Sequence, residues 1–86
     1  MNAEDKLRAL PFGTFRGRAH DKTFVISKTG FANGASLKLV AEALDGSDYI
    51  SLNMYDLAAG ARLFPCEMPM AKVLAFLEQL EIDHQV

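Results

Sequence analysis

The sequence predicts an α+β fold, in which an antiparallel meander sheet of four to five strands carries one long C-terminal helix on one face. Turn signals at Gly30, Asn33-Gly34, Asp45-Gly46 and Ala59-Gly60 cut the first three quarters of the chain at nearly even intervals. Asn-Gly and Asp-Gly tolerate the positive φ angles of tight hairpins, which favours antiparallel neighbours. The last quarter instead repeats apolar residues at the 3- and 4-residue spacing of a helix.

The strands are expected at residues 22–28, 36–44, 48–56 and 61–64, with 14–20 leading into the first of them as one bent ribbon. Alternate residues of a strand point to opposite faces of its sheet. One face is apolar and forms the expected core: Phe24, Ile26, Leu37, Leu39, Ala41, Ala43, Ile50, Leu52 and Met54. The other is polar: Thr23, Val25, Ser27, Lys38, Val40, Glu42, Tyr49, Ser51, Asn53 and Tyr55, with Arg62 beyond.

With 86 residues the chain is long enough for one domain and no more. Residues 1–12 form an N-terminal segment in which 3–10 can make a brief helix before Pro11; residues 13–65 form the sheet, and 66–82 the helical segment.

The C-terminal helix is expected from about 69 to 81, because Pro69 suits a first turn and Met70, Val73, Leu74, Leu77 and Leu80 share one face. Phe76 widens this apolar arc beyond what a helix on a small sheet needs. One interpretation is a homodimer that meets through Val73, Phe76 and Leu80. The other is that Phe76 merely flanks the core.

Half of the residues are apolar and 23% are charged, as in an ordinary soluble domain. No run approaches the roughly 20 apolar residues of a membrane span. The lone cysteine cannot form an internal disulfide, and the charged start "MNAEDKLRAL" does not resemble a secretory signal, so a cytoplasmic location without membrane contact is expected. Residues 1–38 hold seven Lys or Arg against three acids, and residues 39–86 hold two against eight.

The segment "LFPCEMPM" (63–70) allows three interpretations. Pro65 and Pro69 make it a stiff joint between strand and helix, with Glu67 near the unpaired amides of the helix start. A cysteine near a helix start can also be nucleophilic, which makes Cys66 a candidate for a thiol enzyme. Sulfur atoms of Cys66, Met68 and Met70 are ligands of the kind that copper(I) prefers.

Catalysis finds little further support in the sequence. A thiol nucleophile usually needs a base and a group that orients the base. The two histidines, His20 and His84, are the candidate bases, and neither has a credible partner. There is no Walker-type loop and no His-rich metal spacing. We therefore expect a binding module without cofactor or metal, and keep the thiol enzyme at Cys66 as an alternative.

The polar sheet face has the ingredients of a surface for unpaired bases, because aromatic rings stack on bases while Lys and Arg contact phosphates. Tyr49 and Tyr55 are the candidate stacking residues. The candidate phosphate contacts are Arg16, Arg18, Lys22, Lys28, Lys38 and Arg62. Glu42 and Asp56, on or beside this face, argue against it. The alternative is a protein-interaction or structural module with an ordinary solvated sheet face.

Residues 14–80 resemble one known family in layout. A long first ribbon, hairpins turned at "GFANG" and "LDGSD", the short strand "ARLF" and the helix "PMAKVLAFLEQL" are similar to the β-β-β-β-α module of the positive cofactor 4 family of transcriptional coactivators. The family has a basic-glycine-apolar-serine-leucine run before its helix; in "RLFPCEMP" only Arg62 and Leu63 match it. The resemblance implies a homodimer that binds single-stranded DNA on its sheet. Because stacking on aromatic rings serves any unpaired base, single-stranded RNA is kept as a second candidate ligand.

Overall fold

The chain forms one six-stranded antiparallel sheet and two short helices, and the computed structural model describes residues 2–31, 35–57 and 60–83. In chain order the elements are α1 (Ala3–Ala9), β1 (Gly13–Ala19), β2 (Lys22–Phe31), β3 (Ser36–Ala43), β4 (Tyr49–Leu57), β5 (Gly60–Pro65), α2 (Met70–Gln79) and β6 (Glu81–Ile82). The strands lie in the order β5-β4-β3-β2-β1-β6, so the first five form the predicted meander. The α+β class, the antiparallel sheet and the brief N-terminal helix are confirmed.

The sheet is larger than predicted because β1 and β6 are strands of their own. The segment expected as a bent ribbon is a separate strand, joined to β2 by a turn in which His20 and Asp21 have φ of 53° and 60°. Positive φ at both turn residues matches the twist of a two-residue hairpin. Gly46, with φ of 75°, lies in its predicted turn, whereas Gly30 lies inside β2. The turns expected at Asn33-Gly34 and at Ala59 fall outside the described residues.

The prediction of one long C-terminal helix is wrong, since α2 covers only Met70–Gln79. Leu80 already has an extended backbone, with φ −63° and ψ 126°, and its amide closes the helix on the carbonyl of Phe76. The next two residues pair with Gly17 and Arg18 of β1 as strand β6. Helical periodicity continues to Leu80, but the free edge of β1 draws the following residues into the sheet.

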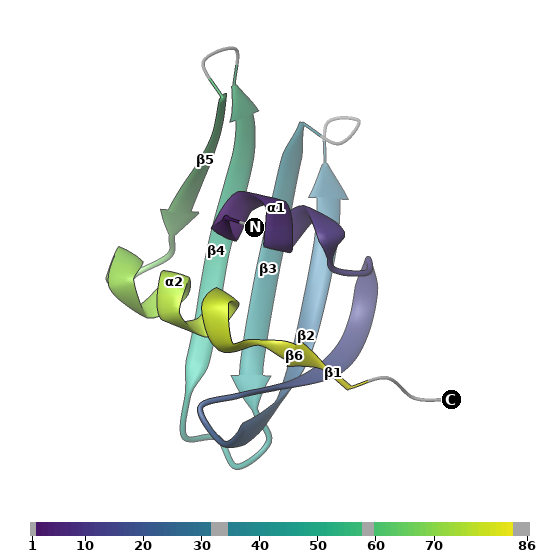
Figure 1. The fold of residues 1–86 in the computed structure, drawn as a ribbon, viewed down its shortest axis with the longest axis vertical. Helices are drawn as coiled ribbons and strands as arrows, with labels where there is room; N and C mark the ends of the chain where they lie inside the picture. Colours follow the sequence, from purple (N-terminus) through teal and green to yellow (C-terminus); the bar gives the residue numbers. More distant parts are fainter. Residues whose placement is uncertain (1, 32–34, 58–59, 84–86) are drawn as a thin grey trace.

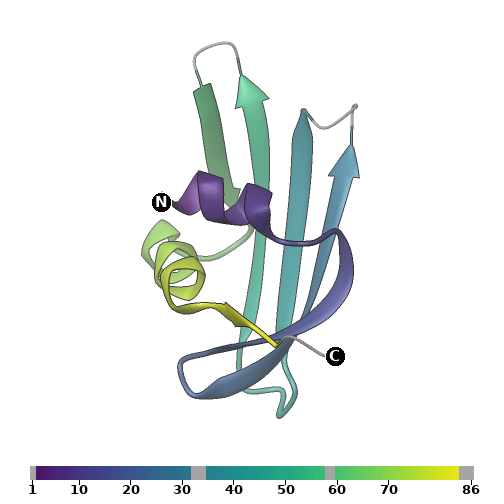
Figure 2. The same cartoon turned by 45° about the vertical axis from the view of Figure 1, so that its right-hand side comes forward.

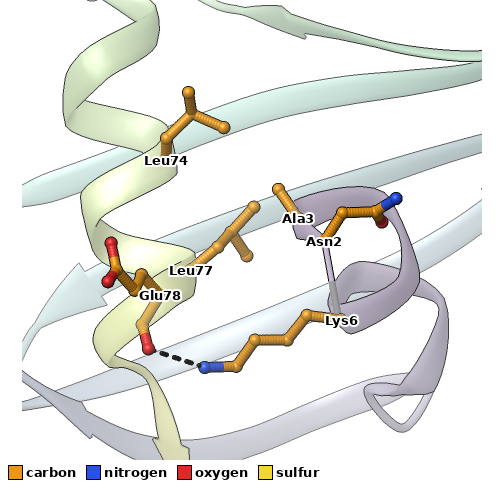
Figure 3. A pocket seen from close by; sticks show the side chains of 6 residues that line it. All are labelled: Asn2, Ala3, Lys6, Leu74, Leu77 and Glu78. Atoms are coloured by element: carbon orange, nitrogen blue, oxygen red, sulfur yellow. Dashed lines mark hydrogen bonds between the residues drawn. The ribbon is translucent and has the colours of Figure 1, made fainter.

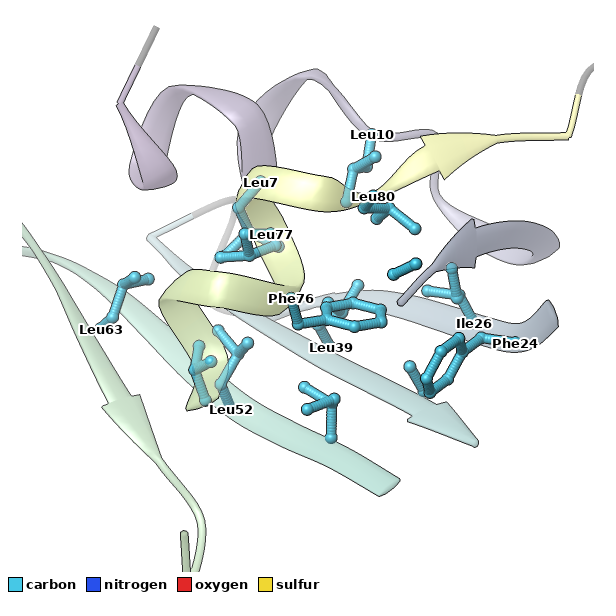
Figure 4. Packing of buried hydrophobic residues seen from close by; sticks show 14 of the residues in the cluster. Leu7, Leu10, Phe24, Ile26, Leu39, Leu52, Leu63, Phe76, Leu77 and Leu80 are labelled. Carbon is cyan, nitrogen blue, oxygen red and sulfur yellow. The ribbon is translucent and has the colours of Figure 1, made fainter. Parts of the chain in front are cut away.

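Both helices pack on the same face of the sheet and leave the opposite face without a helix (Figures 1 and 2). The core lies between these layers, with Phe76 and Leu77 of α2 directed at the strands (Figure 4). The rings of Phe24 and Phe76 meet edge to face at 5.0 Å between centroids. All nine predicted core residues are buried, which confirms the alternation in β2, β3 and β4. Within the described residues, neither helix is long and apolar enough to cross a membrane.

The wide apolar arc of α2 is covered by its own chain. Val73, Phe76 and Leu80, expected at a dimer interface, are 0%, 0% and 4% exposed inside one copy. Leu7 of α1 joins the same core, so α1 covers the flank of α2 that the sheet cannot reach (Figure 4). A second copy cannot contact these three side chains while the core is intact, and that interface assignment is therefore withdrawn.

Candidate nucleic-acid interface

The helix-free face of the sheet, the open face, carries an unusual set of side chains at one end. Strand register aligns them in two neighbouring rows across the sheet. The first row is Phe31, Ser36, Tyr55 and Arg62, and the second is Thr29, Lys38, Asn53 and Phe64. These rows hold three aromatic rings and two cations, and no carboxylate.

We call Phe31, Tyr55, Phe64, Lys38 and Arg62 the aromatic patch. Its three rings are 52%, 39% and 45% exposed in the order given, so each offers part of its surface to a ligand. The rings of Tyr55 and Phe64 lie 5.4 Å apart at 64°, a favourable edge-to-face pair. This pairing holds both rings in place on neighbouring strands.

Two acids near the ends of β4, Asp48 and Asp56, belong to the helix side, and Asp56 is one of the two that the sequence analysis placed on or beside the polar face. Asp48 accepts a salt bridge from Lys72 of α2, with 2.9 Å between Nζ and Oδ1. The hydrogen bond from Lys72 is also the main cause that lowers the pKa of Asp48. Asp56 is paired with Arg8 of α1. The objection that Asp56 would repel a phosphate on the open face is therefore removed.

The far end of the open face is more mixed in charge. One row runs from Arg16 through Val25 and Glu42 to Tyr49, which is 47% exposed. At the β1 margin Arg18 lies opposite Glu81 in register, and Asp83 borders a hollow shared with Arg16. The cationic character of the face is consequently strongest at the aromatic patch.

Lys28, a candidate phosphate contact, does not lie on the open face. It points into the interface between sheet and helices and is only 2% exposed. Its Nζ donates to the carbonyl oxygens of Leu10 and Arg8, and burial lowers its pKa. The alternation that places Phe24 and Ile26 in the core also places Lys28 there. The sequence-based assignment of Lys28 to phosphate binding followed the charge of the residue and not this alternation.

Lys22, another candidate contact, sits at the base of β2 opposite Ala19. Its charge helps to lower the pKa of Asp45 and of Asp48, behind the hydrogen bonds that dominate each shift. Of the eight residues proposed from the sequence, Arg16, Arg18, Lys38, Tyr49, Tyr55 and Arg62 share the open face by register, and Lys22 and Lys28 do not.

Two aromatic residues of the patch were missed by sequence reasoning. Phe31 continues the alternation of β2 past Gly30, which had been assigned to a turn. Phe64 alternates with the buried Leu63 in β5 and therefore faces outward. The period-2 pattern would have identified Phe31 if its strand had been drawn past Gly30. It would also have identified Phe64, which follows Arg62 by two residues within the expected strand 61–64.

Cys66 lies after the end of β5 and not at a helix start. Its amide donates to the carbonyl of Ser51 at 2.9 Å, which extends the pairing of β4 with β5. Its sulfur accepts a hydrogen bond from the Asn53 amide at 3.4 Å. Glu67 turns the chain with φ of 60°, and in the described structure no side chain caps α2, whose first turn holds no acid. The joint is architectural in geometry, and the expected role of Glu67 at the helix start is corrected.

The helix side has its own hollow, a groove of about 490 Å³ between α1 and α2 (Figure 3). Leu74 and Leu77 line it on one side and Ala3 on the other. The Lys6 ammonium at its rim donates to the backbone carbonyl of Glu78 at 3.1 Å, so this cation is already engaged. Two of its polar lining residues are engaged within the fold, since the Asn2 side chain accepts from the Asp5 amide and Lys6 donates to the Glu78 carbonyl. Among the described residues, no cluster of His, Cys, Asp and Glu is placed to hold a metal ion.

The face that concentrates exposed aromatic and cationic side chains is therefore the open face of the sheet. No protein-family model, curated protein or solved structure matches this chain.

Proposed function

We propose that this protein binds single-stranded DNA or RNA on the open face of its sheet, through the aromatic patch. The observation that carries the proposal is the pair of adjacent rows that present Phe31, Tyr55 and Phe64 with Lys38 and Arg62 and without an acid. Stacking of bases on aromatic rings is tolerant of sequence, and cations beside the rings hold the phosphates. Both parts are needed, and both occur here within neighbouring rows.

The location of the acids supports the same proposal. The carboxylates of Asp48 and Asp56 are tied to Lys72 and Arg8 on the helix side. A polyanion that approaches the aromatic patch therefore meets Lys38 and Arg62, which form no ion pair within the described residues, although the whole chain carries a net charge of −2. The two rows of the aromatic patch thus hold cations without acids, which a count of charges along the sequence does not reveal.

The test is a two-dimensional NMR titration of the labelled protein with an oligothymidine of about ten nucleotides. Shifts are expected to gather at Phe31, Lys38, Tyr55, Arg62 and Phe64 and to fade when salt rises from about 50 mM to about 200 mM. Phe64→Ala should weaken binding, because each base-aromatic stack contributes about 1–3 kcal/mol.

A matched control comes from the opposite face. Leu74→Ala removes an apolar side chain of similar exposure, 41% against 45% for Phe64, from the helix side. Its affinity for the oligonucleotide should equal that of the unaltered protein. An unchanged spectrum at low salt would refute nucleic-acid binding by this face.

A second candidate function, assembly with a partner protein, is favoured by the free edge of β5, and a second copy of this chain fits that edge. The hydrogen bond from the Cys66 amide to the Ser51 carbonyl indicates which residues of β5 direct their backbone groups at β4. The backbone groups of Arg62 and Phe64 point to β4, and those of Ala61 and Leu63 point away from it. Two β5 strands paired antiparallel about Leu63 would exchange bonds at Leu63 and join the Ala61 amide to the Pro65 carbonyl. In this register Pro65 has no amide to return to the Ala61 carbonyl, so one hydrogen bond of that pair is missing. The register sets Arg62 opposite the Phe64 ring of the second copy.

Light scattering tests this homodimer. The unaltered chain should have twice its mass of 9.4 kDa, and Ala61→Pro should return it to 9.4 kDa. The Ala61 amide points away from β4, so proline there removes no bond within one copy. Leu74→Ala should remain dimeric. A monomer of the unaltered chain at all concentrations would exclude the homodimer.

A further inference from the structure

We propose that Glu42 and Tyr49 form a guanine-selective subsite at the far end of the open face. This inference rests on the proposed binding of single-stranded nucleic acid and adds base selectivity to it. A carboxylate on a surface that binds a polyanion is unfavourable by charge alone. Its place next to an exposed ring gives it a role in reading a base.

The register brings the two side chains together. Glu42 and Tyr49 are direct cross-strand partners of β3 and β4. The adjacent pair, Ala43 and Asp48, is joined by a backbone hydrogen bond of 3.0 Å, so Glu42 and Tyr49 form a non-hydrogen-bonded pair. In such a pair the Cα atoms are about 4.5 Å apart and the side chains are at their closest.

Both groups are free to meet a ligand. Tyr49 is 47% exposed and Glu42 is exposed as well. Neither side chain makes a hydrogen bond or ion pair within the described ranges 2–31, 35–57 and 60–83. The nearest cation in the same row is Arg16, with Val25 and its strand between them. The Glu42 carboxylate is therefore available as an acceptor beside the Tyr49 ring.

The chemistry of the carboxylate selects among the bases. An ionised carboxylate only accepts hydrogen bonds. In the proposed subsite a base stacked on Tyr49 turns its Watson–Crick edge to Glu42, one of the two edges on which single-stranded bases are read. Guanine presents two adjacent donors there, N1–H and the N2 amino group. Adenine and cytosine place a ring-nitrogen acceptor beside their donor, and thymine and uracil place carbonyl oxygens on both sides of one donor.

The subsite is separate from the aromatic patch. Tyr49 and Tyr55 lie six positions apart on β4, which corresponds to about 20 Å of strand. The patch can thus hold a nucleic-acid strand without regard to sequence while Glu42 reads a base elsewhere along it. Selectivity and affinity are therefore separable by substitution.

The experiment measures anisotropy of labelled oligothymidines of about ten nucleotides that carry one central guanine, inosine, adenine or cytosine. Inosine lacks the N2 amino group and removes one of the two donors. The guanine oligonucleotide should bind roughly tenfold more tightly than the other three, the scale of a bidentate base contact. Glu42→Gln should abolish the preference, because the amide replaces one acceptor with a donor.

Glu78→Gln is the matched control, since it removes the same charge from the exposed surface of α2. It should keep the guanine preference. Equal affinity for all the oligonucleotides would overturn the guanine subsite and leave the proposed binding function in place. A preference that survives Glu42→Gln would likewise overturn it, and no binding of any oligonucleotide at low salt would overturn both proposals.

Discussion

The ammonium nitrogen of Lys28 lies 2.7 Å from the carbonyl oxygen of Leu10, so a lysine of β2 closes the end of α1. It also donates to the carbonyl of Arg8 at 2.9 Å and lies 4.4 Å from the centre of the Phe12 ring. The last carbonyls of a helix have no partner within the helix. Lys28 supplies one from the sheet and thereby fastens the N-terminal segment over the core.

Lys28→Met should destabilise the protein by about 1–3 kcal/mol, because it leaves the carbonyl groups of Arg8 and Leu10 without this donor while it keeps an unbranched apolar chain in place of the lysine stem. Urea unfolding measures the loss. Amide exchange in α1 should accelerate more than exchange in β3, since α1 is held by this contact. Unchanged or higher stability of Lys28→Met would contradict this prediction. The free-energy cost of burying the lysine would then equal or exceed the stabilisation from its hydrogen bonds.

Asp48→Asn should reduce the dependence of stability on acid pH. The hydrogen bond from Lys72 lowers the folded-state pKa of Asp48 below its ordinary 3.8. A lowered carboxylate pKa stabilises the fold above the unfolded pKa, and this contribution is lost as pH falls below about 4 through the folded pKa. At neutral pH the partly exposed pair should contribute at most about 1 kcal/mol.

Urea unfolding at neutral pH and at several pH values below 4 tests this pair. Lys72→Met should reproduce the effect of Asp48→Asn, and the double variant should add little to either one. If the stability of Lys72→Met fell with decreasing pH as steeply as that of the unaltered protein, the lowered pKa of Asp48 could not be assigned to Lys72.

Arg62→Ala and Lys38→Ala should each flatten the salt dependence of oligonucleotide binding. For single strands the slope of log affinity against log salt is about −0.7 per phosphate contact. Loss of one contact should therefore reduce the slope by about 0.7 in either variant. Lys6→Ala, which removes a cation from the helix side, should leave the slope unchanged. Equal slopes in all four proteins would exclude these two residues as phosphate contacts.

Cys66 should be alkylated by iodoacetamide at neutral pH no faster than a small free thiol. The reactive species is the thiolate. The Cys66 residue is partly buried, and its sulfur receives a hydrogen bond from the neutral Asn53 amide and, within the described residues, none from a cationic side chain. Comparison of alkylation rates over a range of pH measures this. A rate well above that of the free thiol would revive the thiol enzyme.

Gly17→Ala should be markedly destabilising, whereas Gly30→Ala should have a small effect. A Cβ atom on Gly17 would lie 2.8 Å from Leu80 and 3.0 Å from the carbonyl oxygen of Glu81, a backbone atom of β6. A Cβ atom on Gly30 would lie 3.0 Å from the exposed ring of Phe12, which can move, and 3.7 Å from the Leu37 side chain, an ordinary contact distance. Overpacking of the first kind typically costs 1–3 kcal/mol. Thermal unfolding of the two variants gives the comparison, and equal losses would contradict it.

Local pattern was sufficient to predict much of the architecture. Alternation in β2, β3 and β4 placed nine residues in the core correctly, because the side-chain period of a strand is a property of the strand alone. The helix around Val73 and Leu77 followed in the same way from its spacing. Tyr49, Tyr55, Lys38 and Arg62 were assigned to one face by the same rule.

Tertiary structure decided which groups meet. It buried Lys28 beneath α1, paired Asp48 and Asp56 with helix cations, and covered Phe76 with the chain itself. It also turned residues after Leu80 into β6, placed Phe31 in the same row as Tyr55 with Ser36 between them, and set the Phe64 ring against that of Tyr55. These outcomes depend on partners far away in the sequence, and periodicity describes only the direction in which a side chain leaves its own element.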